Sequence, residues 1–227
     1  IPLSKIIEIL LNGIISEDTF YLIWIVVMII SLSYLMKKIG DTEQIVQSMK
    51  EIIPSMKARI AILPAVIGLL PMPGGAAFSA PMVDVCDTEN NLSPTQKTAI
   101  NYWFRHIWEY WWPLYPGAIL AFGYSGLKLW QFSLIQFPFT IFGILGGAIF
   151  LLRNISDNLL PCTKSQNQNR ELLKSLMPVL IIVIVSISLS FLGDRLPNRF
   201  FPISIAIIPA FIYLHIARDI SLKQWRD

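Results

Sequence analysis

Residues 60–83 read IAILPAVIGLLPMPGGAAFSAPMV, and this stretch decides how the chain can fold. Its first apolar part, 60–70, is about half as long as the 20 residues that a helix needs to cross a bilayer. The segment PMPGG at 71–75 then breaks any helix, and a second short apolar part leads to a polar loop. This order predicts a re-entrant helical hairpin over 57–93, which is tolerated at membrane depth only where protein or a cavity surrounds it.

The composition of the chain indicates a membrane protein. Of its 227 residues, 54% are hydrophobic and 15% are charged, and the mean hydropathy is +0.58. Soluble domains carry about 25% charged residues. The net charge of +3 forms no continuous basic patch, so nucleic-acid binding is not predicted. Cys86 and Cys162 lack metal-type spacing, and no disulfide between them is expected if both of their loops face the cytoplasm.

The remaining segments predict an all-α polytopic membrane protein in contact with the lipid bilayer. Because the chain begins with Ile1, we expect a preceding segment to be missing. Successive ranges predict an amphipathic interfacial helix (1–18), a spanning helix followed by a cytoplasmic amphipathic segment (19–56), the hairpin (57–93), a broken transmembrane helix (94–125), a spanning helix (132–152), a cytoplasmic loop (153–174), two spanning helices (175–217) and a basic cytoplasmic tail (218–227).

The distribution of Lys and Arg predicts the orientation of these segments. Thirteen of the 18 basic residues lie in 37–59, 84–98, 153–174 and 218–227, which we therefore assign to the cytoplasmic side. Four lie on the opposite side, namely Lys5, Lys128, Arg195 and Arg199, and Arg105 lies within a membrane segment. This assignment requires the hairpin to enter and leave on the cytoplasmic side, in agreement with its apolar pattern.

Two interruptions at membrane depth predict a binding site. The hairpin tip at 71–76 and the break PLYPG at 113–117 both leave backbone groups without partners inside a helix. Half-helix N-termini carry positive partial charge that favours an anion, and broken helices of this kind are typical of transporter binding sites. The alternative is that these are proline kinks without a chemical role. The candidate residues are Pro73, Gly74, Gly75, Ala76, Ser79, Tyr115 and Gly117, with backbone carbonyls of Gly74, Gly75, Pro113 and Pro116 as candidates for Na⁺.

Ionisable residues between these interruptions could supply charge. Asn101, Arg105 and Glu109 have the i, i+4, i+8 spacing of one helix face, and His106 is adjacent. Each ionisable group at the bilayer centre raises the free energy of membrane insertion by about 2.5–3.5 kcal/mol, so a structural or functional role is expected for it. Arg105 could bind a carboxylate or phosphate, while Glu109 or His106 carries a coupling proton. Alternatively, Arg105 and Glu109 neutralise each other as a structural ion pair.

Seven Trp and Tyr residues crowd 102–115, which predicts either aromatic walls around a polar site or packing alone. The sequence contains no hydrolase, kinase, P-loop or zinc signature. Enzymatic activity, a metal site and a cofactor are therefore not predicted, apart from Na⁺ or H⁺ as a coupling ion.

The motifs LPMPGGAAFSAPMVD (70–84) and INYWFRHIWEYWWPLYPG (100–117) resemble an uncharacterised prokaryotic integral-membrane family, domain of unknown function 401. That family is grouped with the ion-transporter superfamily, alongside gluconate, citrate and arsenite permeases. The resemblance implies two inverted repeats, each with a hairpin and a broken helix, a homodimer, and a location in the prokaryotic inner membrane. It also implies ion-coupled transport of a small anionic solute.

The chain departs from this family pattern in two respects. It lacks the Ser-Asn-Thr signature of the dicarboxylate branch, so a dicarboxylate substrate is not expected. It also contains one inverted repeat and only the start of a second, at 175–217. We therefore expect the second half of the site in a missing part of the chain or in a partner chain.

The function predicted from the sequence is a secondary active transporter that binds a small anionic solute at the membrane midplane. Two alternatives remain open. One is an intramembrane enzyme that uses Glu109 and His106 as acid and base on a lipid-like substrate. The other is a structural subunit of a membrane complex, in which the ionisable residues pair only with protein groups.

Overall fold

The computed structural model describes residues 2–70, 72, 75–87, 91–160 and 166–217, and these residues fold almost entirely as helices. The described part contains no strand, and its one isolated β-bridge joins Ser55 to Leu159. The elements are α1 (Leu3–Ile14), α2 (Glu17–Lys38), α3 (Asp41–Ile52), α4 (Met56–Gly68), α5 (Gly75–Cys86), α6 (Pro94–Arg105), α7 (Pro116–Ser125), α8 (Leu129–Gly147), the π-helical η1 (Ala148–Leu152), α9 (Gln166–Ser190), the 3₁₀-helical η2 (Gly193–Arg195) and α10 (Phe201–Ala217).

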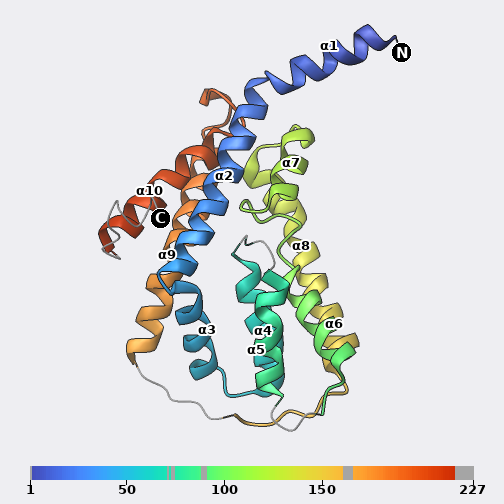
Figure 1. Ribbon diagram of the computed structural model, residues 1–227, viewed down its shortest axis with the longest axis vertical. Helices are drawn as coiled ribbons and strands as arrows, with labels where there is room; N and C mark the ends of the chain where they lie inside the picture. Colours follow the sequence, from blue (N-terminus) through green and yellow to red (C-terminus); the bar gives the residue numbers. More distant parts are fainter. Residues whose placement is uncertain (1, 71, 73–74, 88–90, 161–165, 218–227) are drawn as a thin grey trace.

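The helices form an elongated bundle with two distinct ends (Figure 1). The connection between α3 and α4, the start of α6 and the end of η1 lie at one end, while the turn between α7 and α8 and the segment after α9 lie at the other. The helices α4 and α5 rise side by side from the first end to about half the height of the bundle. The helix α6 also stops near half height, and α7 continues toward the second end.

Three helices are long and apolar enough to cross a membrane. They are α2, the continuous α8–η1 helix over Leu129–Leu152, and residues Asn169–Ser190 of α9. These helices confirm three of the four predicted spans and an all-helical membrane-type fold. The fourth, α10, is also apolar, and its 17 residues lie at the lower limit of the length that crosses a bilayer.

Local signals explain where α2 begins and ends. The Ser16 hydroxyl accepts a hydrogen bond from the Thr19 backbone N–H at 3.2 Å, which caps the N-terminus. Glu17 lies in the first turn, and Lys37 and Lys38 lie in the last turn. Both placements match the charge of the helix dipole. At the C-terminus, Gly40 adopts φ +81°, a backbone conformation that lets the chain turn into α3.

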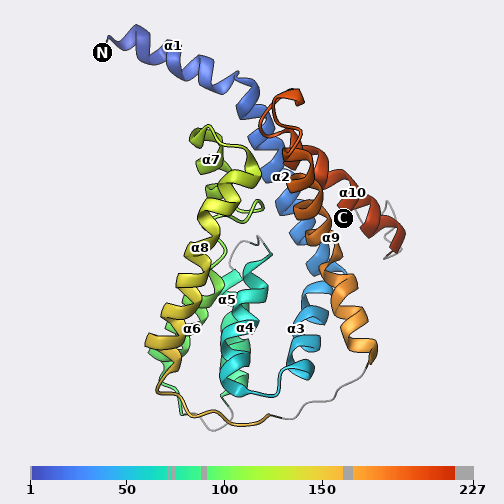
Figure 2. The same cartoon turned by 180° about the vertical axis from the view of Figure 1, so that it is seen from behind.

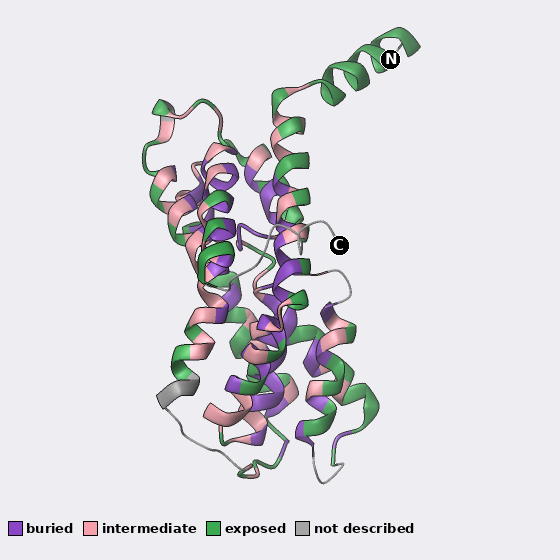
Figure 3. Cartoon of the chain, turned by 60° about the vertical axis from the view of Figure 1, so that its left-hand side comes forward, coloured by how far each residue is buried: buried purple, intermediate pink, exposed green. Residues whose placement is uncertain are grey.

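Two groups of buried apolar residues hold the bundle together. The larger group joins α2, α7, α9 and α10 with the start of α8, and the smaller one joins α4, α5, α6 and η1. Buried positions concentrate where these helices face one another, whereas α1 is exposed along its whole length (Figure 3). Exposed Ile, Leu and Phe side chains on the outer faces of α2 and α8 are expected for helices that contact lipid.

The first end of the bundle is tied together by polar contacts. The Asp157 carboxylate accepts hydrogen bonds from the Ser55 hydroxyl at 2.8 Å and from the Lys57 N–H at 3.0 Å. These bonds close the N-terminus of α4, where helix N–H groups lack partners. The bonds lower the pKa of Asp157 from its ordinary value, because they favour the ionised carboxylate. The segment after η1 thereby holds the N-terminal end of α4 in place.

Asp87 is a buried carboxylate that directly follows α5, and its contacts hold the C-terminal end of that helix in place. These contacts also make the stability of the protein depend on pH. The Asp87 carboxylate accepts N–H groups of Asn91 and Leu92 at 3.0 and 3.1 Å and lies 3.0 Å from the Lys97 ammonium. Burial alone would raise the pKa of Asp87, but these hydrogen bonds and the Lys97 charge outweigh burial and lower it. The stabilisation is therefore present above the ordinary carboxyl pKa and is lost as the pH falls through the lower folded-state value.

We expect the thermal midpoint of the purified protein to decline between about pH 5 and pH 3, with part of this decline absent in Asp87→Asn. At pH 6 the variant should be less stable than the wild type. Asp84→Asn is the matched control, because Asp84 is 69% exposed and contacts only one of the same partners, Lys97. Identical pH profiles for the wild type and Asp87→Asn would show that Asp87 does not carry this dependence.

Candidate functional site

The helix α6 starts where the sequence predicts and ends earlier. Ser93 and Gln96 form a capping box, and Pro94 occupies the first turn. The sequence predicts the break at 113–117, but α6 ends at Arg105 and the chain runs through turns from 106 to 115. From 106 to 115 several backbone N–H groups donate to carbonyls three residues earlier, as in turns, and Pro113 has no N–H to donate. A helix cannot carry a proline without losing the hydrogen bond to the carbonyl four residues earlier, here that of Glu109.

The early end of α6 separates residues that the i, i+4, i+8 spacing had grouped. Asn101 and Arg105 share α6, whereas Glu109 lies beyond its end and is exposed. The prediction that Glu109 shares a helix face with Asn101 and Arg105 is therefore wrong. Among the described residues, no ion pair joins Arg105 to Glu109, which lies instead 3.7 Å from the His106 imidazole. His106 is half-buried at the end of α6.

Arg105, the last residue of α6, meets the start of α5. Its side chain is 5% exposed, and its Nη2 donates to the Met72 carbonyl at a long 3.4 Å. A Cβ added to Gly75 would lie 1.9 Å from Nη2, so the guanidinium occupies the space that a larger residue would need. Its Nε has no hydrogen-bond partner within the described part of the chain. The predicted tip residue Gly75 and the predicted cation Arg105 are thus in direct contact.

Asn101 and Ser79 connect α6 to α5 near the same level. The Ser79 hydroxyl donates to Asn101 Oδ1 at 2.5 Å, and Asn101 Nδ2 donates to the Ala76 carbonyl at 2.8 Å. Both side chains are buried. Their polar groups therefore join the two helices, a role that the sequence analysis did not assign to them.

The aromatic segment between α6 and α7 closes the C-terminus of α4. Trp108 Nε1 donates to the Ala65 carbonyl at 2.7 Å, and the Tyr115 hydroxyl donates to the Gly68 carbonyl at 2.6 Å. The Val66 and Ile67 carbonyls accept backbone N–H groups instead. All four carbonyls that a helix C-terminus leaves unpaired are thus satisfied.

A third indole extends this arrangement, because Trp112 Nε1 donates to the Leu69 carbonyl at 3.0 Å. On the opposite side, Trp111 Nε1 donates to Thr140 of α8 at 2.9 Å. The aromatic composition of 102–115 predicted walls around a polar site or packing, but not this hydrogen-bonding role. A usable signal was present: α4 ends without a basic residue in its last turn, while the 106–115 segment is rich in side-chain N–H and O–H donors.

Other predicted site residues lie apart or outside the described residues. Pro73 and Gly74 are not described, so neither their ligand role nor their share of a Na⁺ site is tested. Pro116 and Gly117 are exposed in the first turn of α7, and Pro113 is buried. Among the described residues, no cluster of three His, Cys, Asp or Glu could hold a metal ion.

Comparison with known proteins identifies the family. A family model described as "Protein of unknown function (DUF401)" matches residues 2–216. The chain belongs to this family. No curated protein and no solved structure matches the chain. The predicted membership of the DUF401 family is confirmed, and the link to the ion-transporter superfamily stays a prediction.

Proposed function

We propose that this chain is part of a secondary active transporter for a small anionic solute, which binds between the α4–α5 tip and the end of α6. The observation that carries the proposal is Arg105, a cation at the C-terminus of α6 that is 5% exposed and whose Nε has no hydrogen-bond partner in the described part of the chain. A buried guanidinium is costly unless it is paired, and a carboxylate or phosphate is the partner whose geometry it matches best.

The arrangement of the two short helices supports this proposal. In our proposal α4 and α5 form a re-entrant hairpin, because both begin or end at the same bundle end and neither has the length of a full span. The side chain of Arg105 fills the space beside Gly75, and Arg105 lines none of three cavities found in the structure. We therefore assign this arrangement to a closed state, in which solute entry requires the hairpin to move away from α6.

We further propose that the functional transporter contains a second half, supplied by another copy or by further chain. The side chains of His106 and Glu109, just after the end of α6, are 23% and 45% exposed, and their contact with hydrocarbon would be costly. A covering protein surface would remove that cost. In this scheme H⁺ or Na⁺ is the coupling ion, and the protein resides in a prokaryotic inner membrane.

Thermal-shift screening of the purified protein against small carboxylates, inorganic phosphate and NaCl tests the proposal. We expect at least one anion to raise the midpoint, and Arg105→Lys to abolish this shift, because lysine cannot form the bidentate contact. Arg59→Lys is the matched control: Arg59 is also a buried arginine, 7% exposed, at the base of α4. It should lower the midpoint of the apoprotein but retain the shift.

Two results would contradict the anion site. Either no anion stabilises the protein, or Arg105→Lys keeps the full shift. Gly75→Ala provides a second variant, because it displaces the guanidinium while keeping its charge, and it should also weaken the shift.

A structural subunit is the second candidate function, and the contacts of Asn101 with Ala76 and of Arg105 with Met72 favour it. In that case Arg105→Ala should disrupt assembly into a larger complex, observed as a smaller particle in size-exclusion chromatography, without any effect of anions on stability.

A further inference from the structure

An apolar groove runs along the surface of the bundle between α2 and α10. Its volume is about 370 Å³, which is within the range of ligand-binding pockets. The two helices pack against each other, and both begin at the same end of the bundle (Figure 1 and Figure 2). The distribution of Lys and Arg assigns this end to the side opposite the cytoplasm. The groove therefore starts at the outer end of two neighbouring helices and follows them toward the middle of the bundle.

Each helix lines the groove with one face. The lining residues of both helices have the spacing i, i+3, i+4 and i+7, which places them on a single helix face. They are Glu17, Phe20, Tyr21 and Trp24 of α2, and Phe201, Ser204, Ile205 and Ile208 of α10. The groove is thus formed by two matching helix faces, four of whose eight residues are aromatic.

The polar groups are ordered along the groove. Among the described residues that line it, Glu17 in the first turn of α2 is the only charged one. Trp24 lies seven residues further along α2, which corresponds to about 10 Å along the helix axis. The Ser204 hydroxyl is already bonded, because it donates to the Phe200 carbonyl at 3.1 Å. The groove is therefore charged at its outer end and apolar further in, which is the polarity profile of an amphiphile.

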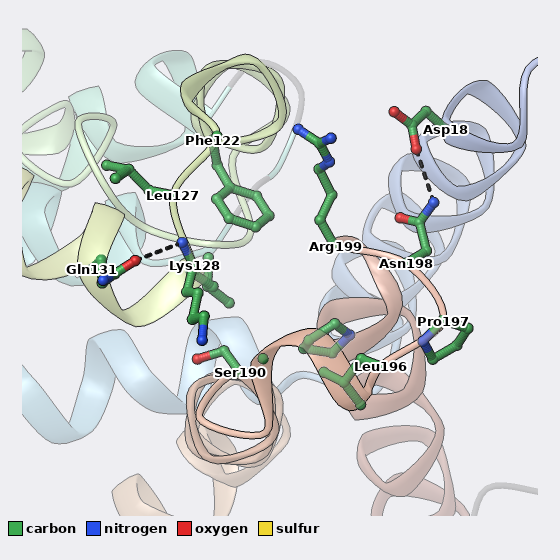
Figure 4. Close-up of a pocket in the computed structure, with 14 residues that line it drawn as sticks. Asp18, Phe122, Leu127, Lys128, Gln131, Ser190, Leu196, Pro197, Asn198 and Arg199 are labelled. Carbon is green, nitrogen blue, oxygen red and sulfur yellow. Dashed lines mark hydrogen bonds between the residues drawn. The ribbon is translucent and has the colours of Figure 1, made fainter.

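The Glu17 carboxylate is available to a ligand. It is exposed, and within the described part of the chain it forms no ion pair. The neighbouring Asp18 differs, because its carboxylate accepts a hydrogen bond from Asn198 Nδ2 at 2.8 Å (Figure 4). Asp18 also lines two other cavities rather than this groove. The outer end of the groove consequently presents one negative charge that favours a cationic group.

Two hydrogen-bond donors lie next along the same face of α2. Among the described residues, neither the Tyr21 hydroxyl nor Trp24 Nε1 forms a hydrogen bond. Tyr and Trp side chains are typical of the level at which lipid headgroups meet the acyl chains, where one end of the side chain is polar and the other apolar.

We propose that this groove binds a phospholipid with a primary-amine headgroup, of the phosphatidylethanolamine class. The ammonium group donates to the Glu17 carboxylate, and the ester carbonyls accept from Tyr21 and Trp24. An acyl chain lies against the apolar face of α10. The N-termini of α2 and α10 carry positive partial charge at the outer end, which suits the phosphate beside the ammonium. The proposal concerns a surface apart from the Arg105 site and does not depend on the transport function.

The test uses the whole chain purified in a lipid-free detergent. Native mass spectrometry measures the retention of phosphatidylethanolamine, phosphatidylcholine and phosphatidylglycerol with identical acyl chains. The wild type should retain phosphatidylethanolamine about tenfold more strongly than phosphatidylglycerol, because only the ammonium forms a charge-assisted hydrogen bond with Glu17. Phosphatidylcholine should be intermediate, since its trimethylated nitrogen carries the charge without an N–H.

Four variants separate headgroup recognition from apolar contact. Glu17→Gln should abolish the preference for phosphatidylethanolamine. Asp18→Asn is the matched control, because it removes a charge from the same helix turn but not from the groove, and it should keep the preference. Trp24→Ala should weaken retention of all three lipids. Phe142→Ala should not, since Phe142 is a 69% exposed aromatic residue of α8 outside the groove.

Three results would overturn the proposal. The wild type could retain the three lipids equally, which would show annular lipid only, or Glu17→Gln could keep the wild-type preference. Alternatively, the protein could form a dimer that lipid does not dissociate and that Trp24→Ala breaks, which would assign the groove to a second copy of the chain. Arg105→Lys should leave lipid retention unchanged, so failure of the Arg105 site and failure of this site are separable.

Discussion

Replacing Gly68 with alanine is expected to destabilise the protein by about 3 kcal/mol, because the new Cβ would lie 2.1 Å from the Arg105 backbone carbonyl oxygen. Gly68 ends α4 and Arg105 ends α6, so the two helices approach each other by their backbones at this point. A flexible side chain could rotate away from such a contact, but a backbone carbonyl can move only if α6 moves. We expect a corresponding fall in the urea concentration at the unfolding midpoint.

Gly117→Ala is the control for this substitution. Gly117 lies in the first turn of α7 and has no atom within 4 Å of the position that a Cβ would take. Alanine there should be neutral or stabilising by up to about 1 kcal/mol, since alanine favours the helix over glycine. If Gly68→Ala is as stable as Gly117→Ala, the close approach of α4 and α6 is not present in the folded protein.

Trp112→Ala is expected to have an effect of similar size, about 3 kcal/mol, through loss of packing. Trp112 is 6% exposed and contacts Trp108 and Trp111 at ring-centroid distances of 6.0 and 5.3 Å. The value lies at the lower end of the range for aromatic truncations in soluble cores, because lipid chains are as apolar as the buried surroundings.

Trp112→Phe separates packing from hydrogen bonding. Phenylalanine keeps most of the ring contacts but removes the N–H that the Leu69 carbonyl accepts, which should cost about 1 kcal/mol. Trp24→Ala is the matched control, since Trp24 is 46% exposed on the outer face of α2 and should cost little. An equal loss for Trp24→Ala and Trp112→Ala would contradict the assignment of Trp112 to the core.

The sequence predicted those helices whose length or start is determined by residues within the helix itself. Long apolar runs predicted α2, α8 and α9, and the Ser93-Pro94 pair predicted the start of α6. Spanning length and capping depend on residues within one helix, so a single sequence contains the necessary information.

The candidate site was predicted less accurately from the sequence. The residue pattern identified Gly75 and Arg105 as site residues, and the structure brings them into contact, but it extended α6 past Arg105 to include Glu109. Helical spacing assumes that the helix continues. That assumption failed: after Arg105 the backbone N–H groups of Glu109 and Trp111 donate to carbonyls three residues earlier, which makes turns, and the Trp108 and Trp111 indoles donate to α4 and α8.

What the sequence determined by itself is that residues 60–83 make two short apolar helices around a Pro/Gly interruption, in a membrane-type helical chain of the DUF401 family. Only the tertiary structure decided what completes those helices. The donors for the Ala65 and Gly68 carbonyls, Trp108 and Tyr115, lie 43 and 47 residues further along the chain. An unpaired carbonyl at a helix end requires some donor, but only the packing of α4 against the segment after α6 determines which one.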